Sequence, residues 1–147
     1  MQKSVSTSSS RPRALLVACD GVERHYLRGR LSLRGVDCAD VDEGASAIEY
    51  CADHPVDLVV VDADHLGAGA MRLLRQLRTP HACRPAPAVA LMGQLARGPR
   101  WRATWAKARV LAKPLDPRAL DAWIVHSLGP ALSAPAPKVL FEASVVR

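Results

Sequence analysis

The chain has 147 residues, about half of them apolar, which suits one domain with a substantial core. It has no run of 18 uncharged apolar residues and no apolar stretch near its N-terminus, which argues against a membrane span and a secretory signal. Its net charge of +6 is unevenly spread. Residues 1–71 carry seven Lys and Arg against eleven Asp and Glu, whereas residues 72–118 carry eleven basic residues against Asp116 alone. The second half should therefore attract an acidic partner or a polyanion.

The four cysteines are Cys19, Cys38, Cys51 and Cys83. No two of them form a C-x-x-C pair, and none has the spacing of a zinc site. We therefore expect reduced structural thiols and a cytoplasmic location.

Short apolar runs alternate with helical patterns along the chain. The predicted strands are residues 14–18, 36–41, 56–61, 88–92 and 110–112, and the predicted helices are residues 22–34, 44–53, 70–78, 99–108 and 117–128. The strand at 56–61 is mostly β-branched and apolar, as in a strand covered on both faces. Strict alternation of strands and helices predicts an α/β fold with a doubly wound, five-stranded parallel sheet, (βα)5.

Composition also predicts the domain boundaries. Residues 1–12 are Ser-rich and are expected to form a disordered leader, and residues 13–129 form the domain. Residues 130–147 are expected to form a Pro/Ala linker followed by an apolar tail. Because these last residues are too few for an output domain, we expect a stand-alone module.

Several polar residues follow predicted strands. Asp20, Asp62 and Lys113 all fall at carboxyl ends, where ligands bind in sheets of this kind. This edge of the sheet is therefore the candidate site.

The sequence around these positions resembles the receiver domain of two-component response regulators. The matching fragments are Glu43–Ile48, Pro55–Asp62, Gly67 and Leu111–Leu115, within residues 13–129. The resemblance implies the receiver (flavodoxin-like) topology, with Asp62 as the phosphoacceptor and Lys113 as its phosphate-binding partner. It also implies a cis peptide bond between Lys113 and Pro114.

Other positions depart from the family. The acid pair that holds Mg²⁺ in the family is replaced by Ala18 and Cys19, and the Ser or Thr after the fourth strand is replaced by Met92. Val110 replaces the aromatic switch residue, and Leu66 replaces the proline before Gly67. Mg²⁺ needs well-placed oxygen ligands, which alanine and cysteine do not supply. We therefore expect no cofactor; the alternative is a Mg²⁺ site built from Asp20, Asp62 and Asp64.

Individual residues at this edge have competing interpretations. Asp62 is either a phosphoacceptor or a polar residue at a strand end, and we expect Lys113 to form an ion pair with it. Asp20 is interpreted as a turn residue beside Gly21. Cys19 is expected to be buried and inert. The histidines are scattered and are expected to be surface or capping residues.

A basic, tryptophan-containing segment completes the sequence features. It contains Arg97, Arg100, Trp101, Arg102, Trp105 and Lys107. In the family, the fourth helix, fifth strand and fifth helix form the usual partner-binding face, and this composition suits a binding hot spot. We therefore expect a degenerate receiver that is no enzyme and that binds an acidic protein without phosphorylation.

Two alternative functions stay open. The first is a single-domain response regulator that accepts phosphate on Asp62, for which a histidine kinase is a candidate partner. The second is a nucleic-acid binder that uses the basic half, although the sequence has no known nucleic-acid motif.

Overall fold

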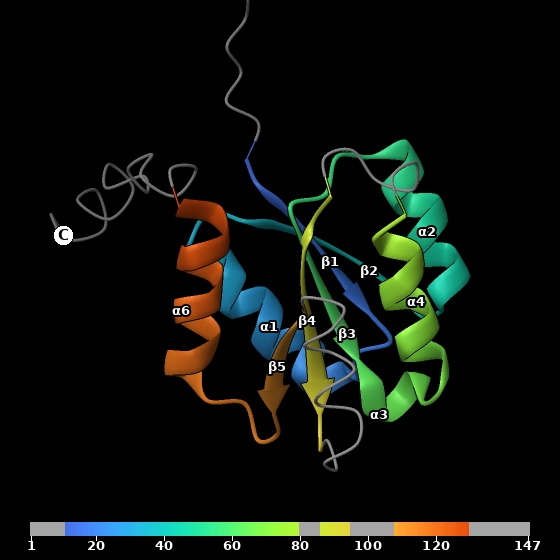
Figure 1. The fold of residues 1–147 in the computed structure, drawn as a ribbon. Helices are drawn as coiled ribbons and strands as arrows, with labels where there is room; N and C mark the ends of the chain where they lie inside the picture. Colours follow the sequence, from blue (N-terminus) through green and yellow to red (C-terminus); the bar gives the residue numbers. More distant parts are fainter. Residues whose placement is uncertain (1–10, 80–85, 95–107, 130–147) are drawn as a thin grey trace, which may run out of the picture.

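A computed structural model describes residues 11–79, 86–94 and 108–129 (Figure 1). In chain order, the elements are β1 (Arg13–Val17), α1 (Gly21–Leu33), β2 (Asp37–Val41), α2 (Gly44–Asp53), β3 (Leu58–Asp62), α3 (Ala63–Leu66), α4 (Gly69–Leu77), β4 (Ala88–Gly93), β5 (Arg109–Ala112) and α6 (Pro117–Leu128). All strand pairs are parallel, in the order β2-β1-β3-β4-β5. The predicted fold class is confirmed.

The elements differ from the predictions mainly at their ends. The predicted bounds of α2 and α6 are confirmed, those of the other predicted elements that the structure describes are shifted by one or two residues, and the four-residue helix α3 was not predicted. Asp62 begins α3 because its side chain accepts hydrogen bonds from the backbone N–H groups that follow. Most of the helix predicted over residues 99–108 lies outside the described residues. So do residues 130–147 and most of the predicted leader.

The sheet is covered on both faces (Figure 1). In β1, Leu15 and Val17 face α2 and α4, whereas Ala14 and Leu16 face α1 and α6. All five residues of β3 are buried, which explains why its sequence is nearly continuously apolar. Asp62 is the last residue of this buried strand and lies at the carboxyl edge of the sheet.

The core is built almost entirely from aliphatic side chains. The buried face of α6 carries Leu120, Trp123, Ile124 and Leu128. This confirms that Trp123 belongs to the core, with only 4% of its surface exposed. No described helix is long and apolar enough to cross a membrane. Cys19, Cys38 and Cys51 form no disulfide with one another.

Candidate functional site

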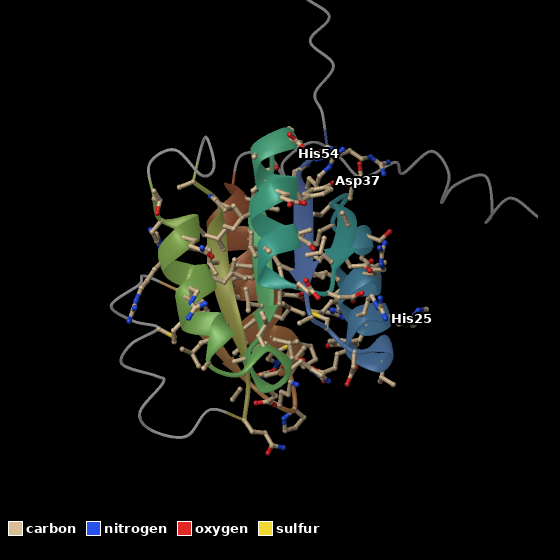
Figure 2. The ribbon with its side chains drawn as sticks, turned by 90° about the vertical axis from the view of Figure 1, so that its right-hand side faces the viewer. His25, Asp37 and His54 are labelled. Atoms are coloured by element: carbon tan, nitrogen blue, oxygen red, sulfur yellow. The ribbon has the colours of Figure 1, made fainter. Side chains whose placement is uncertain are left out.

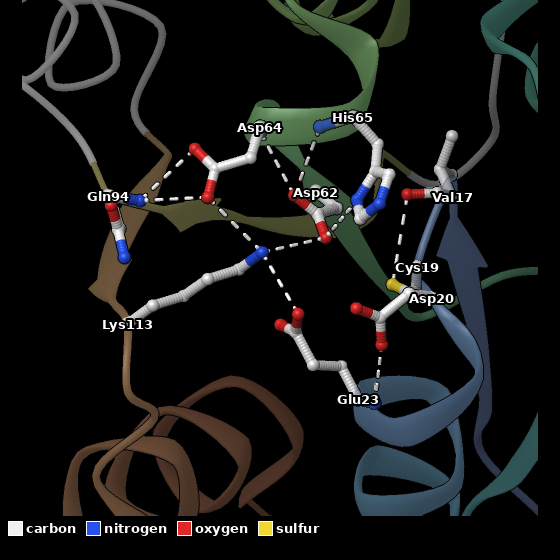
Figure 3. A network of polar contacts seen from close by, with 9 residues as sticks. All are labelled: Val17, Cys19, Asp20, Glu23, Asp62, Asp64, His65, Gln94 and Lys113. Atoms are coloured by element: carbon white, nitrogen blue, oxygen red, sulfur yellow. Dashed lines mark hydrogen bonds and ion pairs between the residues drawn. The ribbon is translucent and has the colours of Figure 1, made fainter.

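Asp62 is the centre of a polar network at the carboxyl edge of the sheet (Figure 3). It is the last residue of β3 and the only fully buried charged residue in the described part of the chain. A buried carboxylate is stable only when it is paired and hydrogen-bonded. Its partners therefore define what the site can do.

Both oxygens of the Asp62 carboxylate accept hydrogen bonds. Oδ1 accepts from the backbone N–H of Asp64 at 2.9 Å and of His65 at 3.4 Å. Oδ2 lies 3.0 Å from Lys113 Nζ and 2.8 Å from His65 Nδ1. Because a carboxylate only accepts, Nδ1 of His65 must carry a proton. The carboxylate is thus fully engaged by donors from this chain.

Lys113 joins Asp62 to two further acids. Its Nζ lies 3.0 Å from Glu23 Oε1 and 3.2 Å from Asp64 Oδ2, and only 14% of its side chain is exposed. Burial opposes the charge, but hydrogen bonds to Asp62 and Glu23 outweigh it and raise the pKa of Lys113 above its ordinary value. Lys113 therefore stays cationic, and its peptide bond to Pro114 is cis, as the resemblance implies.

One oxygen of the Asp20 carboxylate is bound to the start of helix α1. Asp20 is the N-cap of α1, and its side chain accepts the backbone N–H of Glu23 at 2.8 Å. That backbone hydrogen bond lowers the pKa of Asp20. The structure thus places Asp20 at the start of a helix.

Glu23 and His65 belong to the network although the sequence did not identify them. Glu23 lies in the first turn of α1 and reaches Lys113 from the side of that helix (Figure 3). His65 is a surface residue, as predicted, with 48% of its side chain exposed, but its contact with Asp62 was not predicted. The available signal for His65 was its place three residues after a capping aspartate. His25 and His54 lie far apart from each other (Figure 2).

The donor set at the end of β1 does not fit Mg²⁺. Ala18 offers no side-chain oxygen, and Cys19 offers a sulfur where a hard cation needs oxygen. Burial, and then the charges of Asp62 and Glu23, raise the pKa of Cys19 to about 12, so its thiol stays protonated. Within the described ranges, no group of His, Cys, Asp and Glu is arranged to hold a metal ion. The cation that contacts Asp62, Asp64 and Glu23 in this structure is the Lys113 ammonium.

Strand β4 supplies backbone to the site. Met92 pairs with Asp62 in the sheet and is fully buried in the core, and its thioether has no donor for a phosphoryl oxygen. Gly93 follows, and a Cβ there would lie 2.8 Å from Asp64 Oδ1, so a side chain at this position would require the Asp64 carboxylate to move. The backbone N–H of Gln94 donates to both Asp64 oxygens at 3.2 Å. Gly93 was also missed by the sequence analysis.

The predicted partner-binding residues lie outside the described residues; they are Arg97, Arg100, Trp101, Arg102, Trp105 and Lys107. The neighbouring elements β5 and α6 are described. Together with the start of β4 they line a hollow of about 580 Å³, whose lining includes Arg109, Val110, Trp123 and His126.

No protein-family model matches the sequence, and no curated protein matches it. Solved structures do match. A signal receiver domain of an HD domain-containing protein from Pseudomonas fluorescens Pf-5 is 25% identical, with a TM-score of 0.70 over 84% of this chain and 98% of that one. A response regulator receiver protein from Pseudomonas putida is 22% identical, with a TM-score of 0.69 over 80% and 98%. The chemotaxis protein CheY4 of Vibrio cholerae is 14% identical, with a TM-score of 0.69 over 81% and 100%.

Proposed function

We propose that this chain, which has the fold of response regulator receiver domains, is a signalling module that acts by binding another protein without being phosphorylated. The observation that carries the proposal is the state of Asp62. Both of its oxygens are occupied by Lys113, His65 and two backbone N–H groups. A carboxylate held in this way is a poor nucleophile, because attack requires donors to be displaced.

The local charge also opposes phosphorylation. Four carboxylates, those of Asp20, Glu23, Asp62 and Asp64, surround the site, and Lys113 and His65 are the basic side chains in the same network. Phosphoryl transfer to a carboxylate needs positive charge to offset the phosphoryl oxygens. Lys113 is already shared among three acids, and Ala18 and Cys19 add no ligand for a metal ion.

Incubation with Mg²⁺ and acetyl phosphate, followed by intact-mass measurement, tests this proposal. We expect no added phosphoryl group on the wild-type protein. Asp62→Asn is the matched control because it keeps the shape of the side chain and removes the nucleophile. A phosphoryl gain in the wild type that is lost in Asp62→Asn contradicts the proposal.

That result would favour the alternative function, a receiver that accepts phosphate on Asp62. One observation speaks for it: Asp62 ends β3 and lies 3.0 Å from Lys113, as the resemblance to the family requires. A histidine kinase is then the candidate phosphoryl donor.

For the binding surface we propose the face formed by residues 97–107, β5 and α6. Its described part supports this assignment, because Arg109 is exposed, Val125 is 43% exposed and a hollow of about 580 Å³ lies between β5 and α6. Exposed apolar and aromatic groups beside arginines are typical of hot spots, with the charge steering association. The proposed partner is an acidic protein.

Crosslinked capture from the native cell identifies the partner, and its affinity is then measured for Trp101→Ala and Arg102→Ala. We expect Trp101→Ala to weaken binding by about 2 kcal/mol or more. Arg28→Ala is the control, since it removes an arginine that pairs with Asp40 on the acidic half. Micromolar binding of oligonucleotides at about 0.15 M salt would instead support a nucleic-acid partner.

A further inference from the structure

A second pocket lies beside the Asp62 network, between the start of α1 and the loop that joins β5 to α6. Its volume is about 480 Å³, within the range of small-ligand sites. The described residues that line it are Val22, Glu23, Tyr26, Gln94, Lys113, Pro114 and Leu115. It thus shares Glu23 and Lys113 with the network.

Two polar atoms of its lining residues are buried without a hydrogen-bond partner in the described part of the chain. They are Glu23 Oε2 and the Tyr26 hydroxyl oxygen. Figure 3 shows the contrast within Glu23, where one oxygen is joined to Lys113 and the other is joined to nothing drawn. Unpaired buried polar groups are costly, and few native proteins leave them so. Both oxygens can accept a hydrogen bond, so these two lining residues offer two unused acceptors.

The two acceptors come from the same side of one helix. Glu23 and Tyr26 are three residues apart in α1, and side chains at this spacing are neighbours on a helix surface. A group with several N–H donors suits two acceptors placed on neighbouring side chains. A primary ammonium has three such donors and no acceptor.

The charge around Glu23 favours a cation over an anion. Burial is the largest influence on Glu23 and raises its pKa; the contact with Lys113 comes next and lowers it, and the charges of Asp62 and Asp20 raise it by less. The geometry gives the sign of the local charge: one ammonium, that of Lys113, is shared by the three carboxylates of Glu23, Asp62 and Asp64, so an added positive charge is attracted. An anionic ligand would meet the same carboxylates at close range.

Among the other lining residues, Val22, Pro114 and Leu115 are apolar and Gln94 is polar. Val22 is 81% exposed at its rim, and Pro114 and Leu115 form the opposite wall. Apolar surface placed next to two unused acceptors suits a ligand with a charged head and a hydrocarbon body. A water molecule could satisfy the acceptors but would gain nothing from these walls.

We propose that this pocket binds a primary ammonium group carried on an apolar chain, with N–H donors to Glu23 Oε2 and the Tyr26 hydroxyl oxygen. The chemistry is shared by small organic amines and by the lysine side chain of a peptide. The inference is independent of the proposed function, because it uses neither phosphorylation of Asp62 nor the β5–α6 face.

Titration of ¹⁵N-labelled protein with phenethylamine, followed by NMR amide shifts, tests the proposal. We expect saturable shifts at Val22, Glu23 and Leu115, and none with N-acetylphenethylamine, which has the same ring but no charge. Glu23→Gln should weaken binding about tenfold or more, since it removes a charged acceptor. Tyr26→Phe should weaken it less, and because this variant leaves the Glu23–Lys113 pair intact, it keeps the test valid if Glu23→Gln unfolds.

Glu49→Gln is the matched control, because it makes the same chemical change on the exposed surface of α2 and should leave binding unchanged. A blocked lysine, Nα-acetyl-lysine methylamide, distinguishes the two sources: tighter binding than phenethylamine assigns the pocket to a peptide lysine, and weaker binding assigns it to a free amine. Absence of saturable shifts, equal binding of the acetylated analogue, or no effect of either pocket variant overturns the proposal.

Discussion

The carboxyl ends of β3 and β1 are adjacent in the sheet but differ in chemistry. At the end of β3, Asp62 is buried and is bound by Lys113 and His65. At the end of β1, Ala18 has no polar side-chain atom, and Cys19 keeps its proton because burial raises the pKa of its thiol. Asp62 at the end of β3 contacts cationic partners, whereas Ala18 and Cys19 at the end of β1 lack the side-chain oxygens that Mg²⁺ requires. The two strand ends therefore differ in that Asp62 takes part in an ion pair, whereas Ala18 and Cys19 offer no side-chain oxygen.

The largest expected effect on stability comes from Lys113→Ala, which removes the cation that pairs with Asp62 at the end of β3. Asp62 is fully buried and the Lys113 side chain is 14% exposed, so the pair resembles a buried ion pair more than a surface one. Removing the ammonium leaves three carboxylates without their shared cation. We expect a loss of about 3 kcal/mol in the free energy of unfolding, measured by urea denaturation.

Lys113→Met is the matched control for packing, since it keeps a long side chain without the charge. It should lose nearly as much stability as Lys113→Ala. Unchanged or increased stability in both variants would show that the pair is not favourable.

Cys19→Asp tests the β1 side. A new carboxylate there meets Asp62 and Glu23 in a poorly solvated position, so we expect a loss of about 2 kcal/mol without metal. Because the new oxygens are hard ligands, Mg²⁺ should raise the Tm of this variant, whereas it should leave the wild-type Tm unchanged.

Cys19→Asn has the same shape as Cys19→Asp and no charge, so it should show little response to Mg²⁺. If Mg²⁺ raises the wild-type Tm as much as that of Cys19→Asp, the residue at position 19 does not control the response to Mg²⁺.

A smaller effect is expected from the backbone at the end of β1. Ala18 has a φ of +60°, a conformation that costs an L-residue with a Cβ more than it costs glycine. Ala18→Gly should therefore stabilise the fold by up to about 1 kcal/mol in thermal denaturation. Ala122→Gly, on the exposed face of helix α6, should destabilise it by a similar amount, and a loss in both variants would argue against strain at Ala18.

The smallest expected effect is the pH dependence due to His65. Its hydrogen bond to Asp62 raises the pKa of His65 above the ordinary value of 6.5. The resulting stability is fully present below pH 6.5 and is lost as the pH rises through the higher folded-state pKa. NMR titration of the His65 ring should show a raised pKa in the wild type that returns toward 6.5 in Asp62→Asn. If the pKa of His65 is the same in Asp62→Asn as in the wild type, Asp62 is not the cause of its increase.

The fold and the Asp62–Lys113 contact follow patterns that lie along the chain. The buried run at Leu58–Val61 and the alternation of strands with helices are local signals, and parallel strands bring their carboxyl ends together. Glu23 depends instead on how α1 is rotated against the sheet, which brings its carboxylate rather than that of Asp20 to Lys113. Gly93 depends on the distance between β4 and the Asp64 carboxylate. Such contacts between elements are set by packing, and no spacing in the sequence reports them.

The outer strands of the sheet determine how this domain behaves when many copies are crowded together. β2 has one free backbone edge among the described strands, and such an edge can pair with a strand of another molecule. Asp37 is exposed on this strand, and Asp40 is held by ion pairs to Arg24 and Arg28 of α1. The opposite outer strand, β5, has only four residues and begins with the exposed Arg109. Charge on one edge and short length on the other discourage intermolecular strand pairing, so clustering this domain on a shared scaffold should not seed aggregation through its sheet.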